Sequence, residues 1–183
     1  MPDRRQALFV RHVVPVDFSA MAIYLIRHAK AGKKSQWDGS DSTRPLDEVG
    51  RSQAKALAHN IVAHGPTRLV SSPFLRCMET LQDLSALTGL PILADERLAE
   101  DGDIAAVLQM LEQAPDGAVF CSHGDIIPAI IRSLENRGMR FTTAPDWRKA
   151  SVWKLERDGS TFSSSAAWPP PLTGQSGIHL GNN

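Results

Sequence analysis

The sequence has few of the features that mark secreted or membrane-bound proteins. Its two cysteines, Cys77 and Cys121, are not spaced as C-x-x-C, so neither a disulfide framework nor a zinc site is expected. No apolar run approaches the about 20 residues that span a bilayer, and the N-terminus lacks the segment order of a signal peptide. These absences predict a cytoplasmic protein that does not bind membranes.

An excess of charge of either sign is also lacking. The chain has 20 Lys and Arg and 20 Asp and Glu, a formal net charge of +0. Without an overall positive field, no attraction to nucleic acid is expected, and any attraction for phosphate must be local. The sequence contains no Walker A loop, no G-x-G-x-x-G fingerprint and no zinc spacing, so no cofactor and no metal are expected.

The length and composition are those of a single domain. The chain has 183 residues, of which 42% are hydrophobic, enough for an ordinary core. Residues 1–20 have mixed charge and no clear period, and we expect a disordered leader there. Residues 169–183 are rich in Pro, Gly, Ser and Asn, and we expect a disordered tail. The folded domain should span residues 21–168.

Strand-like and helical patterns alternate along this domain. Strands are expected at 22–26, 68–71, 91–94 and 118–121, with a hairpin of 151–156 and 161–166. One helix is expected to begin at residue 48 and to end at Gly65. Three more helices are expected at 74–88, 104–113 and 126–136. This alternation predicts an α/β fold, a three-layer α/β/α sandwich with a mostly parallel central sheet.

Three of the expected strands lead directly into segments that carry histidine or arginine. Arg27 and His28 follow the first strand, Arg76 follows the second, and His123 follows the strand at 118–121. Reactive groups of α/β sheets collect at the carboxyl ends of the strands, so these four side chains are expected to meet. Guanidinium groups bind phosphate with paired donors, and a neutral imidazole is a nucleophile able to carry a phosphoryl group.

Each of these residues has an ordinary alternative when it is taken alone. Arg27 and His28 would form a surface loop pair, and His123 would be a structural histidine. Arg76, at a helix start, would be solvated or paired with a neighbour such as Glu79. Only the combination of the three segments favours a phosphate site.

The segments Arg27-His28-Ala29, 71–80 (SSPFLRCMET) and 121–125 (CSHGD), in this order, resemble the histidine phosphatase superfamily. The resemblance covers roughly residues 21–168. The superfamily pattern begins R-H-G, whereas this chain has Ala29 in place of the glycine. The stretch 27–50, with its Arg-Pro-Leu segment, is similar to the small bacterial phosphohistidine phosphatases and to the phosphatase domain of actinobacterial Nudix fusions.

The resemblance implies a role for each of these four residues. His28 would be the nucleophile, with Arg27, Arg76 and His123 holding the phosphoryl oxygens. In the superfamily a backbone carbonyl near the residue after the histidine holds the other ring nitrogen. Ala29 can supply such a carbonyl if the turn requires no positive φ.

The resemblance also implies residues that assist the reaction or bind substrate. The segment 97–100 (RLAE) resembles the superfamily's L-x-E segment, so Glu100 is the candidate general acid and base; its alternative is a solvated acidic loop. Small phosphohistidine phosphatases often lack this acid. Arg44, Lys30 and Ser72 are expected to bind substrate, although basic loop residues are usually just solvated.

The predicted function is a metal-independent phosphatase with a phosphohistidine intermediate, a hydrolase of phosphoric monoesters or phosphoramidates. A phosphohistidine phosphatase acting on a phosphorylated protein is the first interpretation. One alternative is a phosphatase of a nucleotide or another small phosphorylated metabolite. The other is a non-catalytic domain that binds phosphoproteins.

Overall fold

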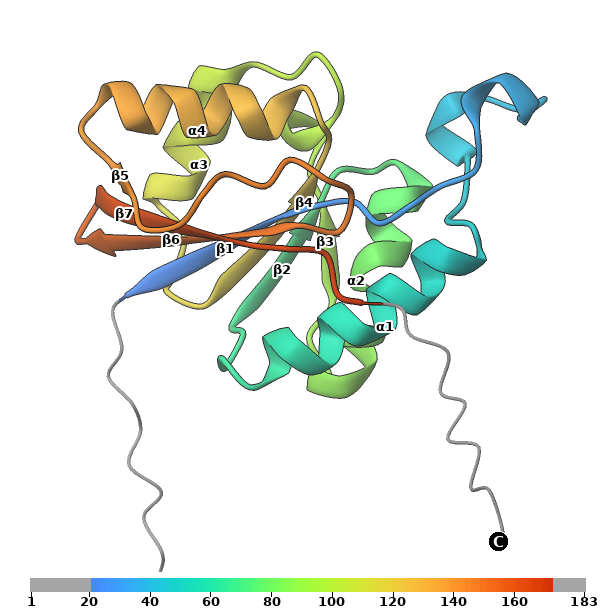
Figure 1. Cartoon of the computed structure of the whole chain (residues 1–183), viewed down its shortest axis with the longest axis horizontal. Coiled ribbons are helices and arrows are strands. Elements are labelled where there is room, and N and C mark those ends of the chain that lie inside the picture. Colours follow the sequence, from blue (N-terminus) through green and yellow to red (C-terminus); the bar gives the residue numbers. More distant parts are fainter. Residues whose placement is uncertain (1–20, 173–183) are drawn as a thin grey trace, which may run out of the picture.

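The structure is a computed structural model that describes residues 21–172, and Figure 1 shows its arrangement. The expected leader at 1–20 and residues 173–183 of the expected tail lie outside the described residues. The strands are β1 Ala22–Arg27, β2 Arg68–Ser71, β3 Ile92–Ala94, β4 Ala118–Ser122, β5 Arg140–Phe141, β6 Val152–Asp158 and β7 Thr161–Trp168. The helices are α1 Glu48–Val62, α2 Leu75–Thr88, α3 Ile104–Glu112 and α4 Ile126–Asn136, and short 3₁₀ helices lie at Lys34–Gln36, Asp41–Thr43 and Glu96–Leu98.

The strands form one seven-stranded sheet in the order β3-β2-β4-β1-β6-β7-β5. The pairs β1–β4, β2–β3, β2–β4 and β5–β7 are parallel. The pairs β1–β6 and β6–β7 are antiparallel. The expected α/β fold with a mostly parallel sheet is therefore confirmed.

The sheet lies between two helical layers, with α1 and α2 on one face and α3 and α4 on the other (Figure 1). Successive side chains of β1 point to opposite faces, as the pleat of a strand requires. Ile23 and Leu25 join the cluster beneath α3 and α4, whereas Tyr24 and Ile26 join the cluster beneath α1 and α2. Two hydrophobic cores thus hold the central strand in place.

Two details differ from the sequence-based expectation. The hairpin turn is shorter than the expected 157–160, because Asp158 still pairs with Thr161 and only Gly159 and Ser160 connect the strands. Gly159 has a φ of 58°, which suits a tight two-residue hairpin turn. The two-residue strand β5 was not expected, since it is too short to show a period. Within residues 21–172, no helix is long and apolar enough to cross a membrane.

Candidate active site

The segments that follow β1, β2 and β4 lie at one edge of the sheet, because these neighbouring strands are parallel. The backbone N–H of His28 donates to the carbonyl of Ser122 at 3.0 Å. The N–H of Ser72 donates to the carbonyl of Cys121 at 2.9 Å. These bonds continue the ladders beyond the strand ends, and they bring His28, Ser72 and His123 together.

The imidazole of His28 is buried, with 5% of the residue exposed. Its Nδ1 lies 2.8 Å from the carbonyl oxygen of Ala29, so Nδ1 carries the proton and Nε2 keeps a lone pair. Burial lowers the pKa of His28 to about 3; the Ala29 carbonyl opposes this shift, and the charges of Arg76, His123 and Lys149 add to it. The ring is therefore neutral near pH 7, as a nucleophile must be.

Ala29 adopts a conformation that any L-residue can take. Among the described residues, the non-glycine positions with positive φ are Asp101 and Ala150, and Ala29 is not one of them. The N–H of Ala29 donates to Oγ1 of Thr80 at 2.9 Å, and the Thr80 hydroxyl donates to the carbonyl of Arg76 at 2.6 Å. The turn thus accepts alanine in place of glycine, and it is tied to the first turn of α2.

His123 lies beside His28, with ring centroids 5.5 Å apart. Its Nε2 is 2.7 Å from Oγ of Ser72, and its Nδ1 is 3.3 Å from Nη2 of Arg76. A guanidinium only donates, so Nδ1 accepts from Arg76 and Nε2 donates to Ser72. Ser72, predicted to bind substrate, therefore contacts His123 and fixes the orientation of its ring.

Arg76 is fully buried in the first turn of α2. Its Nη1 donates to the carbonyl of Asp41 at 2.8 Å and lies 3.2 Å from Oδ2 of the same residue. Its Nη2 lies 2.5 Å from Oε1 of Glu100. The alternative partner Glu79 instead accepts the N–H of Leu46 at 2.7 Å. The ordinary alternative, a local pair of Arg76 with Glu79, is therefore not formed, and the two carboxylates that contact Arg76 come from residues distant in the sequence.

Glu100 lies at the boundary between the buried pocket and solvent. Its Oε1 is 3.4 Å from Nδ1 of His123 as well as 2.5 Å from Arg76, while 37% of its side chain is exposed. The N–H of the next residue, Asp101, donates to Oδ2 of Asp125 at 3.1 Å and ties this loop to the start of α4. Glu100 thus contacts the pocket and can exchange protons with water.

Arg27 is held from two sides. Its Nη1 donates to the carbonyl of Trp147, and its guanidinium packs on Gly124, where a Cβ would lie 2.6 Å from Cζ of Arg27. Burial lowers the pKa of Arg27 and the charge of Asp125 raises it, yet an arginine stays protonated. Within residues 21–172, the buried Nε atoms of Arg27 and Arg76 have no hydrogen-bond partner. Each arginine therefore keeps a donor for an anion.

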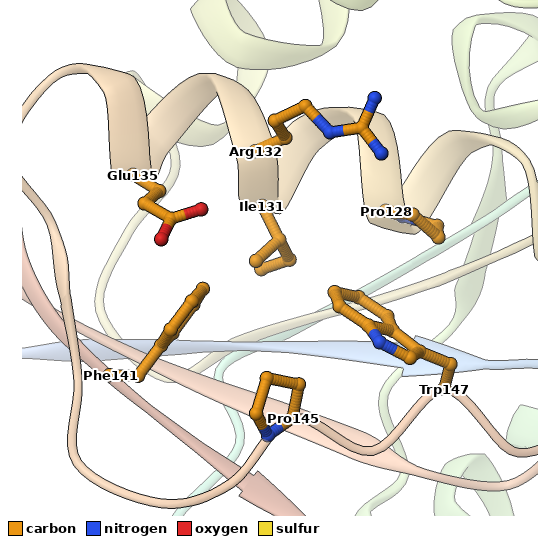
Figure 2. A pocket seen from close by; sticks show the side chains of 7 residues that line it. All are labelled: Pro128, Ile131, Arg132, Glu135, Phe141, Pro145 and Trp147. Atoms are coloured by element: carbon orange, nitrogen blue, oxygen red, sulfur yellow. The ribbon is translucent and has the colours of Figure 1, made fainter.

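The side chain of Trp147 serves a different part of the fold. Its ring packs on Trp153 with centroids 4.7 Å apart. The same ring lines a cavity of about 390 Å³ against α4, and Figure 2 shows Phe141 and Trp147 on opposite sides of this cavity with Ile131 above. Trp147 thus contacts both places: its backbone carbonyl binds Arg27, and its ring lines the cavity beside α4.

Arg44 and Lys30, also predicted to bind substrate, lie beside the pocket rather than in it. Nε of Arg44 is 2.8 Å from Oδ1 of Asp41, and its Nη1 donates to the carbonyl of Gly32 at 2.6 Å. Nζ of Lys30 lies 3.9 Å from Oδ2 of Asp47. Both residues line a second cavity of about 560 Å³. No role was expected for Asp41, Thr80 or Trp147. Asp41 and Thr80 carried a signal, as parts of the segments 27–50 and 71–80, whereas Trp147 carried none.

Comparison with known proteins finds a matching family model and a similar curated protein. Residues 23–103 match the model of the histidine phosphatase superfamily, branch 1. The 8-oxo-(d)GTP phosphatase of Mycolicibacterium smegmatis is 34% identical over 179 residues, which are 92% of this chain and 54% of that protein. The chain thus spans about half the length of this curated relative.

Solved structures share the fold. The protein histidine phosphatase SixA in complex with tungstate superposes with a TM-score of 0.65 at 22% identity, covering 79% of this chain and 96% of that chain. The putative phosphohistidine phosphatase SixA from Agrobacterium tumefaciens gives a TM-score of 0.61 at 20% identity, covering 75% and 92%. The solved structures show a shared fold. The match of residues 23–103 to the family model, together with the similarity to the M. smegmatis protein, shows that the chain belongs to the histidine phosphatase superfamily.

Proposed function

We propose that the chain is a metal-independent phosphatase that transfers the phosphoryl group of a small phosphorylated metabolite to Nε2 of His28 and then to water. The observation that carries this proposal is the state of His28. Its Nδ1 is bonded to the Ala29 carbonyl at 2.8 Å, and its pKa is lowered to about 3 by burial. A neutral, oriented imidazole next to two buried guanidinium groups is suited to attack phosphorus without a metal-activated water.

In the first step, the lone pair of Nε2 forms the bond to phosphorus while the bond from phosphorus to the leaving oxygen breaks. The ring becomes cationic, and Nδ1 keeps its proton and donates it in a hydrogen bond to the carbonyl of Ala29, which stabilises that charge. Arg27 and Arg76 donate to the equatorial oxygens, whose negative charge is spread in the transition state. His123 can donate to them as well once its Nε2–H, which binds Ser72 in this structure, turns to the phosphoryl group. Attack by water then breaks the P–N bond, and the electron pair returns to Nε2.

Glu100 supplies and removes the protons. The phosphoryl oxygens compete with Glu100 for Nη2 of Arg76, so the carboxyl group is released beside the reacting group. In its acid form it gives a proton to the leaving oxygen, and the resulting carboxylate later accepts one from the attacking water. An alkoxide needs such a proton, whereas the imidazole of a phosphoramidate can depart already protonated. The contact of Glu100 with the pocket therefore favours a small-molecule ester over phosphohistidine, which the sequence had favoured first.

Phosphohistidine phosphatase activity is the second candidate. It is supported by the likeness of fold to the two SixA proteins and by the Arg44-Pro45-Leu46 segment. A nucleotide substrate belongs to the first candidate, and the name of the M. smegmatis relative supports it. A non-catalytic phosphoprotein-binding domain is the third, and the orientation of His28 argues against it.

The test is intact-mass analysis after a quench without acid, since phosphohistidine is acid-labile, together with phosphate release in the presence of a chelator. The donors are an aryl phosphate, a nucleoside diphosphate and a phosphohistidine protein. We expect a phosphate-sized adduct or turnover in the wild type and in His59→Ala, which changes an exposed histidine of α1, and neither in His28→Ala. Full activity of His28→Ala, or no adduct and no turnover with any donor, overturns the proposal.

A further inference from the structure

The phosphoryl pocket adjoins a second cavity whose ionisable lining is entirely cationic. This cavity, of about 560 Å³, is lined by Lys30, Lys33, Lys34, Arg44, Arg148 and Lys149, and within residues 21–172 no carboxylate lines it. From this groove we infer a second anion-binding site, for a phosphate carried by the leaving group of the substrate. The inference rests on the proposed function and names its substrate class: a phosphate ester or anhydride that carries a second phosphate.

The backbone joins the groove to the phosphoryl pocket. The N–H of Ala150 donates to the carbonyls of Arg27 and His28, at 3.1 and 3.3 Å. The preceding residue, Lys149, is thereby held against the segment that carries the nucleophile. The positive φ of Ala150, 66°, belongs to this junction, where the chain turns sharply between the groove and β6.

Side chains join the two sites as well. Asp41 lies 2.8 Å from Nε of Arg44 and 3.2 Å from Nη1 of Arg76, so one carboxylate bridges a groove arginine and a pocket arginine. Arg44 also donates to the carbonyl of Gly32, which fixes the wall of the groove. An anion in the groove therefore lies next to the phosphoryl group in the pocket.

The positive charge in the groove exceeds the negative charge that holds it. Arg44 and Lys34 contact Asp41, Lys30 contacts Asp47 and Arg148 contacts Asp146, but Lys149 forms no salt bridge within residues 21–172. Burial lowers the pKa of Lys149, the charges of Arg44, Arg27 and Arg76 lower it further, and the charge of Asp47 opposes this shift. A second phosphate relieves this repulsion and gives the Lys149 ammonium a partner.

The depth of these groups favours a small ligand over an acidic protein surface. Arg44 is only 7% exposed and Lys149 is half-buried, so a flat partner surface does not reach them. Two kinds of molecule have the required chemistry, a nucleoside diphosphate and a sugar bisphosphate. In the first, Nε2 of His28 attacks the terminal phosphorus and the bridging oxygen leaves with the nucleoside monophosphate. In the second, the leaving oxygen is an alkoxide and takes its proton from Glu100.

The test compares wild type, Lys149→Met and Lys55→Met, a matched change on the exposed face of α1. Binding of inorganic pyrophosphate and orthophosphate is measured by calorimetry, which requires no turnover. Steady-state kinetics with a nucleoside diphosphate, a sugar bisphosphate and an aryl phosphate give the ratios of kcat/KM between doubly and singly phosphorylated donors.

We expect the wild type and Lys55→Met to bind pyrophosphate more tightly than orthophosphate. Lys149→Met should lose about 10- to 100-fold of this preference, the effect of one charge-assisted hydrogen bond, and the kcat/KM ratio should fall in parallel. The donor with the higher ratio identifies the source of the second phosphate.

The results distinguish a failure of the proposed function from a failure of the second anion site. Pyrophosphate binding that depends on Lys149, without turnover of any donor, overturns the proposed function and retains the second anion site. Turnover of aryl phosphate without a preference for pyrophosphate overturns the second site alone. Lys149-dependent turnover of a phosphohistidine protein, again without that preference, also overturns it and assigns the groove to an acidic protein surface.

Discussion

Oε1 of Glu100 lies 2.5 Å from Nη2 of Arg76, so the candidate proton donor is bound to a candidate phosphate ligand. The same oxygen lies 3.4 Å from Nδ1 of His123. A phosphoryl oxygen that binds Nη2 of Arg76 must displace this carboxylate, which then lies beside the bound phosphoryl group. Substrate binding and proton transfer are thus coupled through one guanidinium.

This coupling predicts the behaviour of Glu100→Gln. The variant should lower kcat/KM about 10²- to 10⁴-fold for an alkyl phosphate, because an alkoxide needs a proton to leave. The loss should be much smaller for an aryl phosphate with an acidic phenol. The measurement is the dependence of log kcat/KM on leaving-group pKa, and its slope should be steeper in the variant than in wild type. The same slope in wild type and variant would show that Glu100 is not the general acid.

The buried state of His28 predicts a dependence of stability on pH. Burial lowers its pKa to about 3 in the folded protein, against about 6.5 in the unfolded chain. Its contribution to the free energy of unfolding is therefore present above pH 6.5 and is lost progressively as the pH falls toward 3. The free energy of unfolding, measured with urea, should fall less between pH 7 and pH 4.5 in His28→Asn than in wild type. In the control His59→Asn it should fall as much as in wild type.

The contact between Gly124 and Arg27 predicts the effect of a single methyl group. A Cβ at Gly124 would lie 2.6 Å from Cζ of Arg27, so Gly124→Ala must displace the guanidinium. We expect weaker competitive inhibition by orthophosphate and at least about a tenfold loss of kcat/KM, as for the loss of one charge-assisted contact. Inhibition by orthophosphate equal to that of wild type would show that Arg27 does not bind the transferred group.

Trp147 contacts both the cavity beside α4 and the phosphoryl pocket, so its removal should affect both. Trp147→Ala loses the packing on Trp153, which should lower the free energy of unfolding by about 1–3 kcal/mol. It also loosens the carbonyl that binds Arg27, so orthophosphate should bind more weakly. Trp37→Ala, a change of similar exposure in the loop after β1, is the control for both measurements. Unchanged phosphate binding in Trp147→Ala would show that Trp147 does not affect phosphate binding through Arg27.

The sequence by itself determined the alternation of strands and helices and the three segments that carry Arg27, Arg76 and His123. The spacing of hydrophobic residues is a local property, so strands and helices can be read along the chain. The carboxyl ends of adjacent parallel strands share an edge, and this rule alone was enough to predict that His28 and His123 would meet. For Ala29 the sequence set only a condition, that the turn should need no positive φ, and the structure meets it.

Only the tertiary structure decided the partners of these residues. Taken alone, Arg76 would have been solvated or paired with a neighbour such as Glu79. In the structure Arg76 contacts Glu100, and Glu79 accepts the N–H of Leu46. Asp41 and Trp147 lie in loops without a period, and they reach the arginines through long-range packing. Hydrogen bonds between residues far apart in the chain depend on how the loops close over the sheet, and no local pattern encodes that closure.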